Sequence, residues 1–135
     1  YQTSNISTAD RGKLILMIYD HCIKWCTLAI QHIEKNEIEL STKAVFKIQD
    51  GITELTCALD MDKGGKIAHN LFSLYTFYNR HLSTGLQQKS ITPVKEVQSM
   101  LSELKSSWVQ AIEIVRKDDR STIQEQPNNQ IRMVG

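Results

Sequence analysis

The sequence predicts an all-α protein, folded as an antiparallel up-down four-helix bundle with a polar C-terminal tail. Apolar residues recur at spacings of three and four in four separate segments, and glycines, prolines or polar stretches separate these segments. No segment shows the strict alternation of apolar and polar residues that marks a half-buried strand. The connections are short, and short connections favour antiparallel neighbours in a bundle.

The first predicted helix carries apolar residues over residues 14–33. Before it, the segment from Ser7 to Asp10 has the spacing of a capping box, which is typical of a helix start. In the second helix, apolar residues follow the helical spacing over residues 44–59. Ser41 or Thr42 is the expected N-cap of this helix, because a side-chain oxygen there can accept from a free backbone N–H.

The third predicted helix follows two adjacent glycines at positions 64–65, which end the second helix. Its apolar stripe covers residues 67–82, and Gly85 is expected to end it. For the fourth helix, Thr92 is the expected cap, with Pro93 at the first helical position. Its stripe runs over residues 94–115.

These patterns predict a bundle domain at residues 1–115 and an appended tail at residues 116–135. The second segment has few large apolar residues, and Pro127, Asn128 and Asn129 stand in its middle. We therefore expect it to lie outside the bundle.

Composition excludes several classes of protein. With 16 basic and 15 acidic residues, the net charge of +1 gives no overall field for a nucleic acid, so we expect no nucleic-acid partner. The longest nearly unbroken apolar run, Leu14 to Tyr19, is far shorter than the roughly 20 residues needed to cross a bilayer, so no stable membrane insertion is expected. Three cysteines, an odd number, and no recognisable leader predict a cytoplasmic protein without a disulfide framework.

Apolar residues exceed the needs of a bundle core on three of the four predicted helices. At about 100° per residue, the apolar arc of the first helix spans on the order of 240°, and its flank includes Met17, Trp25 and Leu28. Phe46 on the second helix and Phe77 on the third stand away from their core stripes. One explanation is deeper burial of the first helix and ordinary exposed aromatics. The other is a surface that binds an amphipathic segment of a partner, and we assign these five residues to it.

Metal binding and catalysis have little support in the sequence. Cys22 and Cys26 lie one turn apart beside His21, but a zinc site would need Cys57 or His32 as a further ligand brought in by the fold. Free cysteine in a helix stripe is more often a small core residue. There is no phosphate-binding loop, no nucleophile elbow and no carboxylate pair within an apolar stripe. We therefore expect no metal, no cofactor and no enzymatic activity.

One signalling function stays open as the alternative. The run from Ala68 to Leu71, centred on His69, is similar to the start of the phosphorylation signature of histidine phosphotransfer domains, which are also four-helix bundles. Phe72 and Ser73 then replace the lysine and glycine of that signature. The lysine would offset phosphate charge, and the glycine would let another protein approach.

A different resemblance covers residues 1–112. The run Leu59 to Ala68, followed by Asn70-Leu71 and Leu74-Tyr75, resembles the junction between the second and third helices of the FliS family of flagellar secretion chaperones. Leu14 to Asp20 and Trp108 are similar to that family as well. His21-Cys22 and Asp10-Arg11 depart from its usual residues, and residues after Arg116 have no counterpart in it.

This resemblance implies a helical chaperone that binds the disordered C-terminal segment of flagellin. Such a chaperone prevents flagellin from polymerising in the cytoplasm and delivers it to the flagellar export gate. In the family, an N-terminal tyrosine is thought to lie over the binding surface. The matching residue here is Tyr1, and Ile6 is expected to pack beside it.

Overall fold

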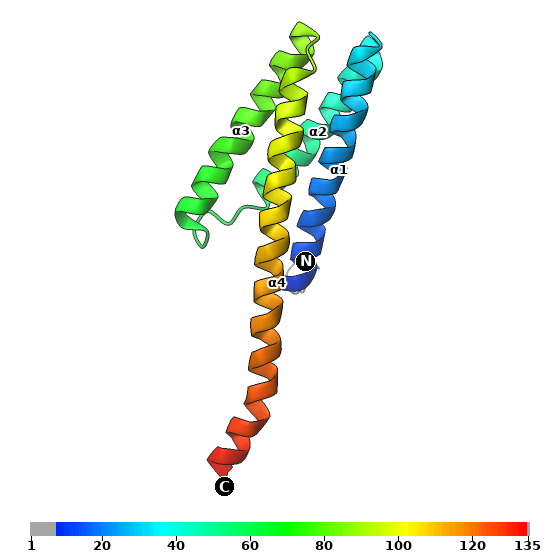
Figure 1. The fold of residues 1–135 in the computed structure, drawn as a ribbon. Helices are drawn as coiled ribbons and strands as arrows, with labels where there is room; N and C mark the ends of the chain where they lie inside the picture. Colours follow the sequence, from blue (N-terminus) through cyan, green and yellow to red (C-terminus); the bar gives the residue numbers. More distant parts are fainter. Residues whose placement is uncertain (1–7, 135) are drawn as a thin grey trace.

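The computed structural model of the chain describes the backbone of residues 8–134 and the side chains of residues 10–120. This part consists of four helices, α1 (Thr8–Glu34), α2 (Ile38–Cys57), α3 (Gly65–Gln88) and α4 (Thr92–Val134), and it contains no strand. Successive helices run in opposite directions along the bundle (Figure 1). The predicted all-α, up-down four-helix fold is confirmed.

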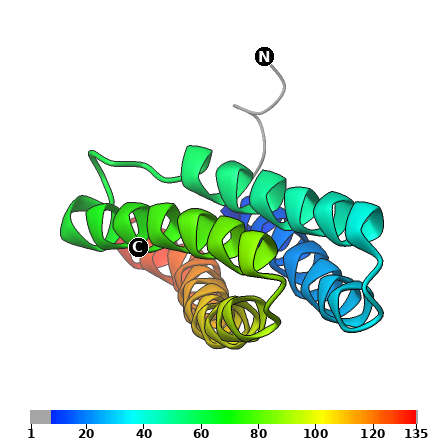
Figure 2. The same ribbon diagram turned by 90° about the horizontal axis from the view of Figure 1, so that it is seen from above.

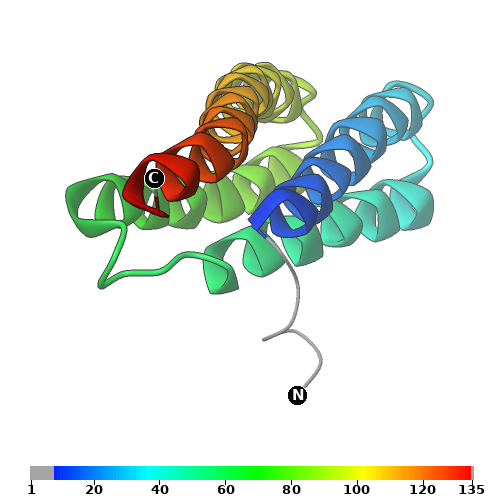
Figure 3. The same ribbon diagram turned by 90° about the horizontal axis from the view of Figure 1, so that it is seen from below.

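Each helix of the bundle packs against two others. α1 and α3 both contact α2 and α4, so α1 lies diagonally across from α3. The views along the bundle show this square arrangement (Figures 2 and 3). Two connections are tight turns, whereas the segment between α2 and α3 is longer and stands at the lower end in Figure 1. The lower end of the bundle is therefore built differently from the upper end.

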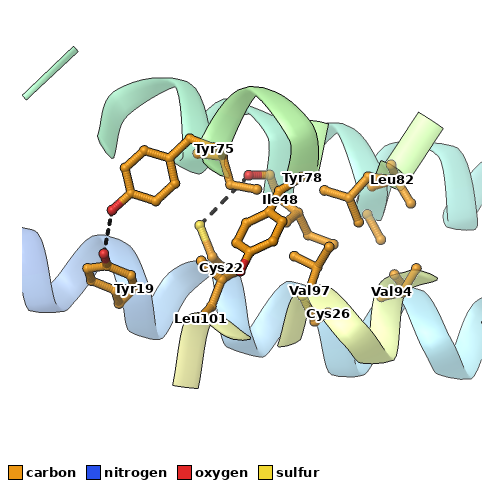
Figure 4. Packing of buried hydrophobic residues seen from close by; sticks show 14 of the residues in the cluster. Tyr19, Cys22, Cys26, Ile48, Tyr75, Tyr78, Leu82, Val94, Val97 and Leu101 are labelled. Atoms are coloured by element: carbon orange, nitrogen blue, oxygen red, sulfur yellow. Dashed lines mark hydrogen bonds between the residues drawn. The ribbon is translucent and has the colours of Figure 1, made fainter. Parts of the chain in front are cut away.

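A single apolar core fills the space between the helices (Figure 4). Gly51 lets α2 approach α1 closely, because a Cβ atom at this position would collide with the Sγ of Cys22. The Cys22 thiol donates to the Ile48 carbonyl of α2 at 3.7 Å, so it serves as a small core residue. The fully buried side chains of largest volume come from all four helices: Tyr19, Cys22, Cys26, Val45, Ile48, Ile52, Tyr75, Leu82, Val94, Val97 and Leu101.

Glutamine side chains join neighbouring helices on the outside of the bundle. Gln49 of α2 donates through Nε2 to the Asn79 carbonyl and to the Ser83 hydroxyl of α3, both at 2.9 Å. In the same way, Gln98 of α4 donates through Nε2 to the Thr27 hydroxyl of α1 at 2.8 Å. These bonds fix the rotation of each helix against its neighbour, beside an apolar core that has little directional preference.

Two predicted helix ends were wrong. α2 begins before Ser41, whose hydroxyl donates back to the Glu37 carbonyl at 2.7 Å instead of capping the helix; the Thr42 hydroxyl donates to the Ile38 carbonyl in the same manner. Gly85 does not end α3, which continues to Gln88 and ends at Lys89 in the left-handed conformation. Gly85 is buried, and a Cβ atom at this position would lie only 3.0 Å from the Cβ of Pro93 on α4. The glycine therefore serves close packing, not chain reversal.

The fourth helix is longer than its apolar stripe predicted. α4 continues beyond residue 115 to Val134 and projects out of the bundle (Figure 1). The predicted tail, residues 116–135, is thus helical over residues 116–134 and extends away from the other helices. The division of residues 116–135 from the bundle as a separate unit stays a prediction. The capping role of Ser7 also stays a prediction, because Ser7 lies outside the described residues.

The core makes a direct prediction for stability. Leu101 is fully buried, whereas Leu40 on α2 is exposed. We expect Leu101→Ala to lower the free energy of unfolding by about 2–5 kcal/mol, because it removes buried apolar contacts and leaves a cavity. The same truncation at Leu40 should change it by less than about 0.5 kcal/mol. Urea denaturation measures both, and equal losses would show that Leu101 is not a core residue.

Candidate partner-binding groove

An apolar hollow of about 400 Å³ opens at the lower end of the bundle, where α2 ends and α3 begins. Its walls come from all four helices and from the α2–α3 connection. The residues that line it are Arg11, Ile15, Leu55, Ala58, Leu59, Asp60, Gly64, Ile67, Ala68, Leu71, Tyr75 and Trp108. Apolar side chains predominate among them, and Ile67 is 72% exposed. The chain thus holds apolar surface open to solvent at this end.

A second hollow, of about 180 Å³, continues from the first between the start of α1 and the middle of α4. Arg11, Ile15 and Trp108 line both hollows. The residues that line only the second are Gly12, Ala111, Ile112, Val115, Arg116 and Asp119. We call the two together the basal groove. It leads from the α2–α3 junction across α1 and onto the part of α4 that leaves the bundle.

The α2–α3 junction shapes one end of the basal groove. Asp60 accepts through Oδ1 from the backbone N–H groups of Asp62 and Lys63, at 3.2 and 2.9 Å, and so holds the turn. Gly65 has a φ angle of +51°, in the left-handed region that favours glycine. At Gly64, a Cβ would lie 2.6 Å from the Cβ of Ala68. The residues of this junction therefore set where α3 begins relative to the end of α2.

The other end of the groove depends on a close contact between α1 and α4. A Cβ at Gly12 would lie 2.8 Å from Cδ1 of Ile112, so glycine lets the start of α1 lie against α4. One turn above the groove, the Asp20 carboxylate forms an ion pair with the Lys105 ammonium of α4. α4 is thus held against α1 before it projects beyond it.

A polar cluster stands where the core meets the groove. The Tyr19 hydroxyl of α1 is hydrogen-bonded to the Tyr75 hydroxyl of α3 (Figure 4). It also accepts from the indole N–H of Trp108 on α4, at 2.9 Å. Burial raises the pKa of Tyr19 and raises that of Tyr75 further above the ordinary value, so both phenols stay neutral at physiological pH. Neutral hydroxyls can donate as well as accept.

The structure does not bring the predicted binding residues together into one surface. Met17 is 64% exposed on α1, whereas Trp25 and Leu28 are half-buried. Phe46 on α2 is 55% exposed and Phe77 on α3 is 48% exposed. None of the five lines the basal groove. Tyr1 and Ile6 lie outside the described residues, so the assignment of all seven to partner binding stays a prediction.

Phe77 already has a neighbour on the bundle surface. Its ring stacks on the ring of His81, with centroids 5.1 Å apart and planes inclined by 20°. The His81 Nε2 atom in turn lies 2.9 Å from Oε2 of Glu96 on α4. Phe77 is therefore partly covered by a residue of its own helix, and that residue in turn contacts α4.

Sequence patterns missed the groove because its walls look like core. Leu71 and Leu104 belong to the apolar stripes of the third and fourth helices, and a stripe residue is ordinarily a core residue. Both are only partly buried, and Leu71 lines the groove. The available signal was the position of each residue along its helix, because a stripe that reaches the end of a helix has fewer neighbours to cover it.

The cysteines are not grouped as metal ligands. Burial raises the pKa values of Cys22 and Cys26 to about 12, and His21 is exposed with its ring against Trp25. Cys57 is exposed at the end of α2. Among the described side chains, no group of three or more His, Cys, Asp or Glu residues is placed to hold a metal ion.

Comparison with known proteins identifies the family. The family model of the flagellar protein FliS matches residues 1–115. The chain belongs to the FliS family. This match includes α1, α2, α3 and the first part of α4, and the residues of both hollows up to Val115. It supports a role as an export chaperone.

Curated relatives agree with the FliS assignment. The flagellar secretion chaperone FliS of Bacillus subtilis (strain 168) is 30% identical over 118 residues, which cover 87% of each chain. That of Salmonella typhimurium is 30% identical over 111 residues, covering 79% of this chain and 80% of the relative. That of Campylobacter jejuni is 31% identical over 108 residues, covering 80% and 84%. In the part of this chain that the structure describes, no helix is long and apolar enough to cross a membrane.

Proposed function

We propose that this FliS-family chain is a cytoplasmic export chaperone that binds the C-terminal segment of flagellin in the basal groove. The chaperone keeps flagellin from polymerising in the cytoplasm, and it catalyses no reaction. The observation that carries this proposal is an apolar groove, open to solvent and lined by all four helices, in a member of a chaperone family. Such a surface is costly to leave in water unless a partner covers it.

The shape and chemistry of the groove suit an amphipathic helix. A helix presents apolar side chains at spacings of three and four along one face, and a groove between helices receives them. Ile15, Leu59 and Leu71 supply apolar walls from α1, the α2–α3 junction and α3. A disordered segment that folds in the groove loses conformational entropy, and burial of apolar surface must offset that loss.

Charged residues at the rim give the bound segment a preferred direction. Arg11 lines both hollows, while Asp60 stands at the junction end of the groove. At the other end, Arg116 and Asp119 follow α4 out of the bundle. Charges of both signs at the edge of an apolar groove favour one register over others more than they add affinity.

The export gate is the second partner that we propose, because an export chaperone has to pass its cargo to the secretion machinery. Nucleic acid is not proposed as a partner, since the net charge is +1. The family match favours the chaperone over histidine phosphotransfer. His69 is an exposed residue of α3, with Nδ1 at 2.8 Å from the Gly65 carbonyl of its own helix.

Titration with a synthetic peptide of the flagellin C-terminal segment from the same organism tests the groove. We expect Ile67→Ser to weaken binding by about tenfold or more without loss of thermal stability, since this side chain lines the groove and is largely exposed. Binding to the wild-type chain should show a large negative heat-capacity change.

Ile38→Ser is the matched control. Ile38 is 60% exposed at the start of α2, at the opposite end of the bundle from the α2–α3 junction. We expect this change to leave the affinity within about twofold of wild type. Equal affinities for the two variants would contradict the placement of flagellin in the basal groove.

The predicted surface outside the groove extends the proposal. A flagellin segment longer than the groove would continue over the bundle, and we propose Phe46, Phe77 and the α1 residues Met17, Trp25 and Leu28 as its further contacts. Tyr1 and Ile6 are proposed to act at the groove itself, as the family resemblance implies.

Single replacements of Tyr1, Phe46 and Phe77 by Ala test these contacts. Phe46 and Phe77 are about half exposed, so we expect melting temperatures within a few degrees of wild type for these two, and the same for Tyr1. Any of the three that is a hot spot should lose more than about 1 kcal/mol of flagellin binding. Early melting with normal binding would place a residue in the core, and no change in either quantity would remove it from the site.

A further inference from the structure

The polar cluster beside the groove has one donor hydrogen more than it uses. Tyr19, Tyr75 and Trp108 together carry two hydroxyl hydrogens and one indole hydrogen. The indole hydrogen goes to the Tyr19 oxygen, and one hydroxyl hydrogen is used between the two phenols. Indole nitrogen accepts nothing, so one hydroxyl hydrogen has no acceptor inside the cluster.

The position of the groove decides which hydroxyl keeps the unused hydrogen. If Tyr75 donates to Tyr19, the hydrogen left over belongs to Tyr19, which is fully buried and does not line the groove. If Tyr19 donates to Tyr75, the hydrogen left over belongs to Tyr75, which does line the groove. Tyr75 is nearly fully buried, but in the second arrangement its unused hydrogen lies at the wall of the groove, where an acceptor that occupies the groove can meet it.

A partner that fills the groove decides whether that hydrogen finds an acceptor. Tyr75 is only 1% exposed, so a bound apolar segment would cover its hydroxyl completely. Affinity then falls unless the segment itself accepts the hydrogen bond. Backbone carbonyls within a helix already accept from their own helix. Those that take a second bond in this chain lie on the outside of the bundle, as at Asn79, or where Gly51 lets two helices approach closely, as at Ile48. A buried carboxylate would be costly. A neutral polar side chain is left as the acceptor.

The chain itself shows which neutral side chain of a helix can accept a hydrogen bond from a neighbouring helix. Thr27 donates its hydroxyl to the Ile23 carbonyl of its own helix at 3.4 Å and accepts from Gln98 of α4. Ser83 donates to the Asn79 carbonyl at 3.3 Å and accepts from a glutamine of α2. A serine or threonine in a helix thus satisfies its own hydrogen and still accepts one from a neighbour. An Asn or Gln amide would bring two further hydrogens into an apolar groove.

We propose that the flagellin segment bound in the basal groove carries a serine or threonine on its apolar face, and that this hydroxyl accepts a hydrogen bond from Tyr75. Tyr75 is then a specificity-determining residue of the groove. The proposal rests on the proposed function, since it describes the same groove and the same partner. It adds a requirement that apolar complementarity alone does not make.

A double-mutant cycle between chaperone and peptide tests the contact. The flagellin C-terminal peptide is made with each Ser replaced in turn by Ala and each Thr by Val. We expect one replacement to weaken binding to the wild-type chain about tenfold, or about 1.4 kcal/mol. Tyr75→Phe should weaken binding of the unmodified peptide to a similar extent. With both changes present, the two losses should not add, because both remove the same bond.

Tyr78→Phe is the matched control one turn further along α3. The Tyr78 hydroxyl is buried without a hydrogen-bond partner among the described residues, and Tyr78 does not line the groove. We expect its removal to leave peptide affinity unchanged and stability unchanged or higher. The melting temperature of each variant shows whether it folds. If Tyr75→Phe does not fold, the peptide series on the wild-type chain decides alone.

Each outcome separates this proposal from the proposed function. Normal binding by Tyr75→Phe, or a peptide series without any sensitive Ser or Thr, would overturn the proposed hydrogen bond. If Ile67→Ser still weakened binding in that case, the proposal that flagellin binds in the basal groove would stand. A peptide that does not bind the wild-type chain would overturn both. Additive losses in the cycle would show that Tyr75 and the sensitive residue act separately, which also contradicts the proposal.

Discussion

The hydrogen bonds among Tyr19, Tyr75 and Trp108 join three helices at the level where the core ends. On one side of them the bundle is closed by Ile48, Leu82 and other fully buried side chains. On the other side the helices no longer cover one another, and the basal groove opens. An apolar contact has little directional preference, whereas these bonds fix how α1, α3 and α4 are rotated. The geometry of the groove walls depends on that rotation.

The ends of the helices supply the rest of the groove. Gly64 and Gly65 start α3 at a distance from the end of α2, and Gly12 lets α1 begin against α4. Each of these glycines is required by a backbone angle or by a close contact, and together they leave a space that no side chain of the described residues fills. The bundle is thus more open at its lower end, where the basal groove lies, than at its upper end, where only a hollow of about 70 Å³ is found among the described residues. An open apolar end is the arrangement that a binding protein needs.

Sequence patterns predicted the fold well because helical periodicity and glycine positions are local signals. They predicted the helix ends less well: Gly85 was assigned to chain reversal although it serves packing against Pro93, a residue eight positions later. They missed the groove, because Leu71 and Ile67 follow the same periodicity as core residues. Whether a stripe residue is covered depends on which other helix reaches its level, and that is a tertiary property. The FliS resemblance was confirmed by the family match. As binding residues it implied only Tyr1 and Ile6, which lie outside the described residues.

The central claim is that a flagellin segment occupies the basal groove at the lower end of the bundle. Methyl NMR spectra of the chain, recorded with and without the flagellin C-terminal peptide, test it most directly. We expect the largest shift changes at Ile15, Leu59 and Leu71, which line the groove, and small changes at Leu40 and Leu86 near the upper end. Large changes confined to the upper end, with Ile15 and Leu71 unaffected, would contradict it.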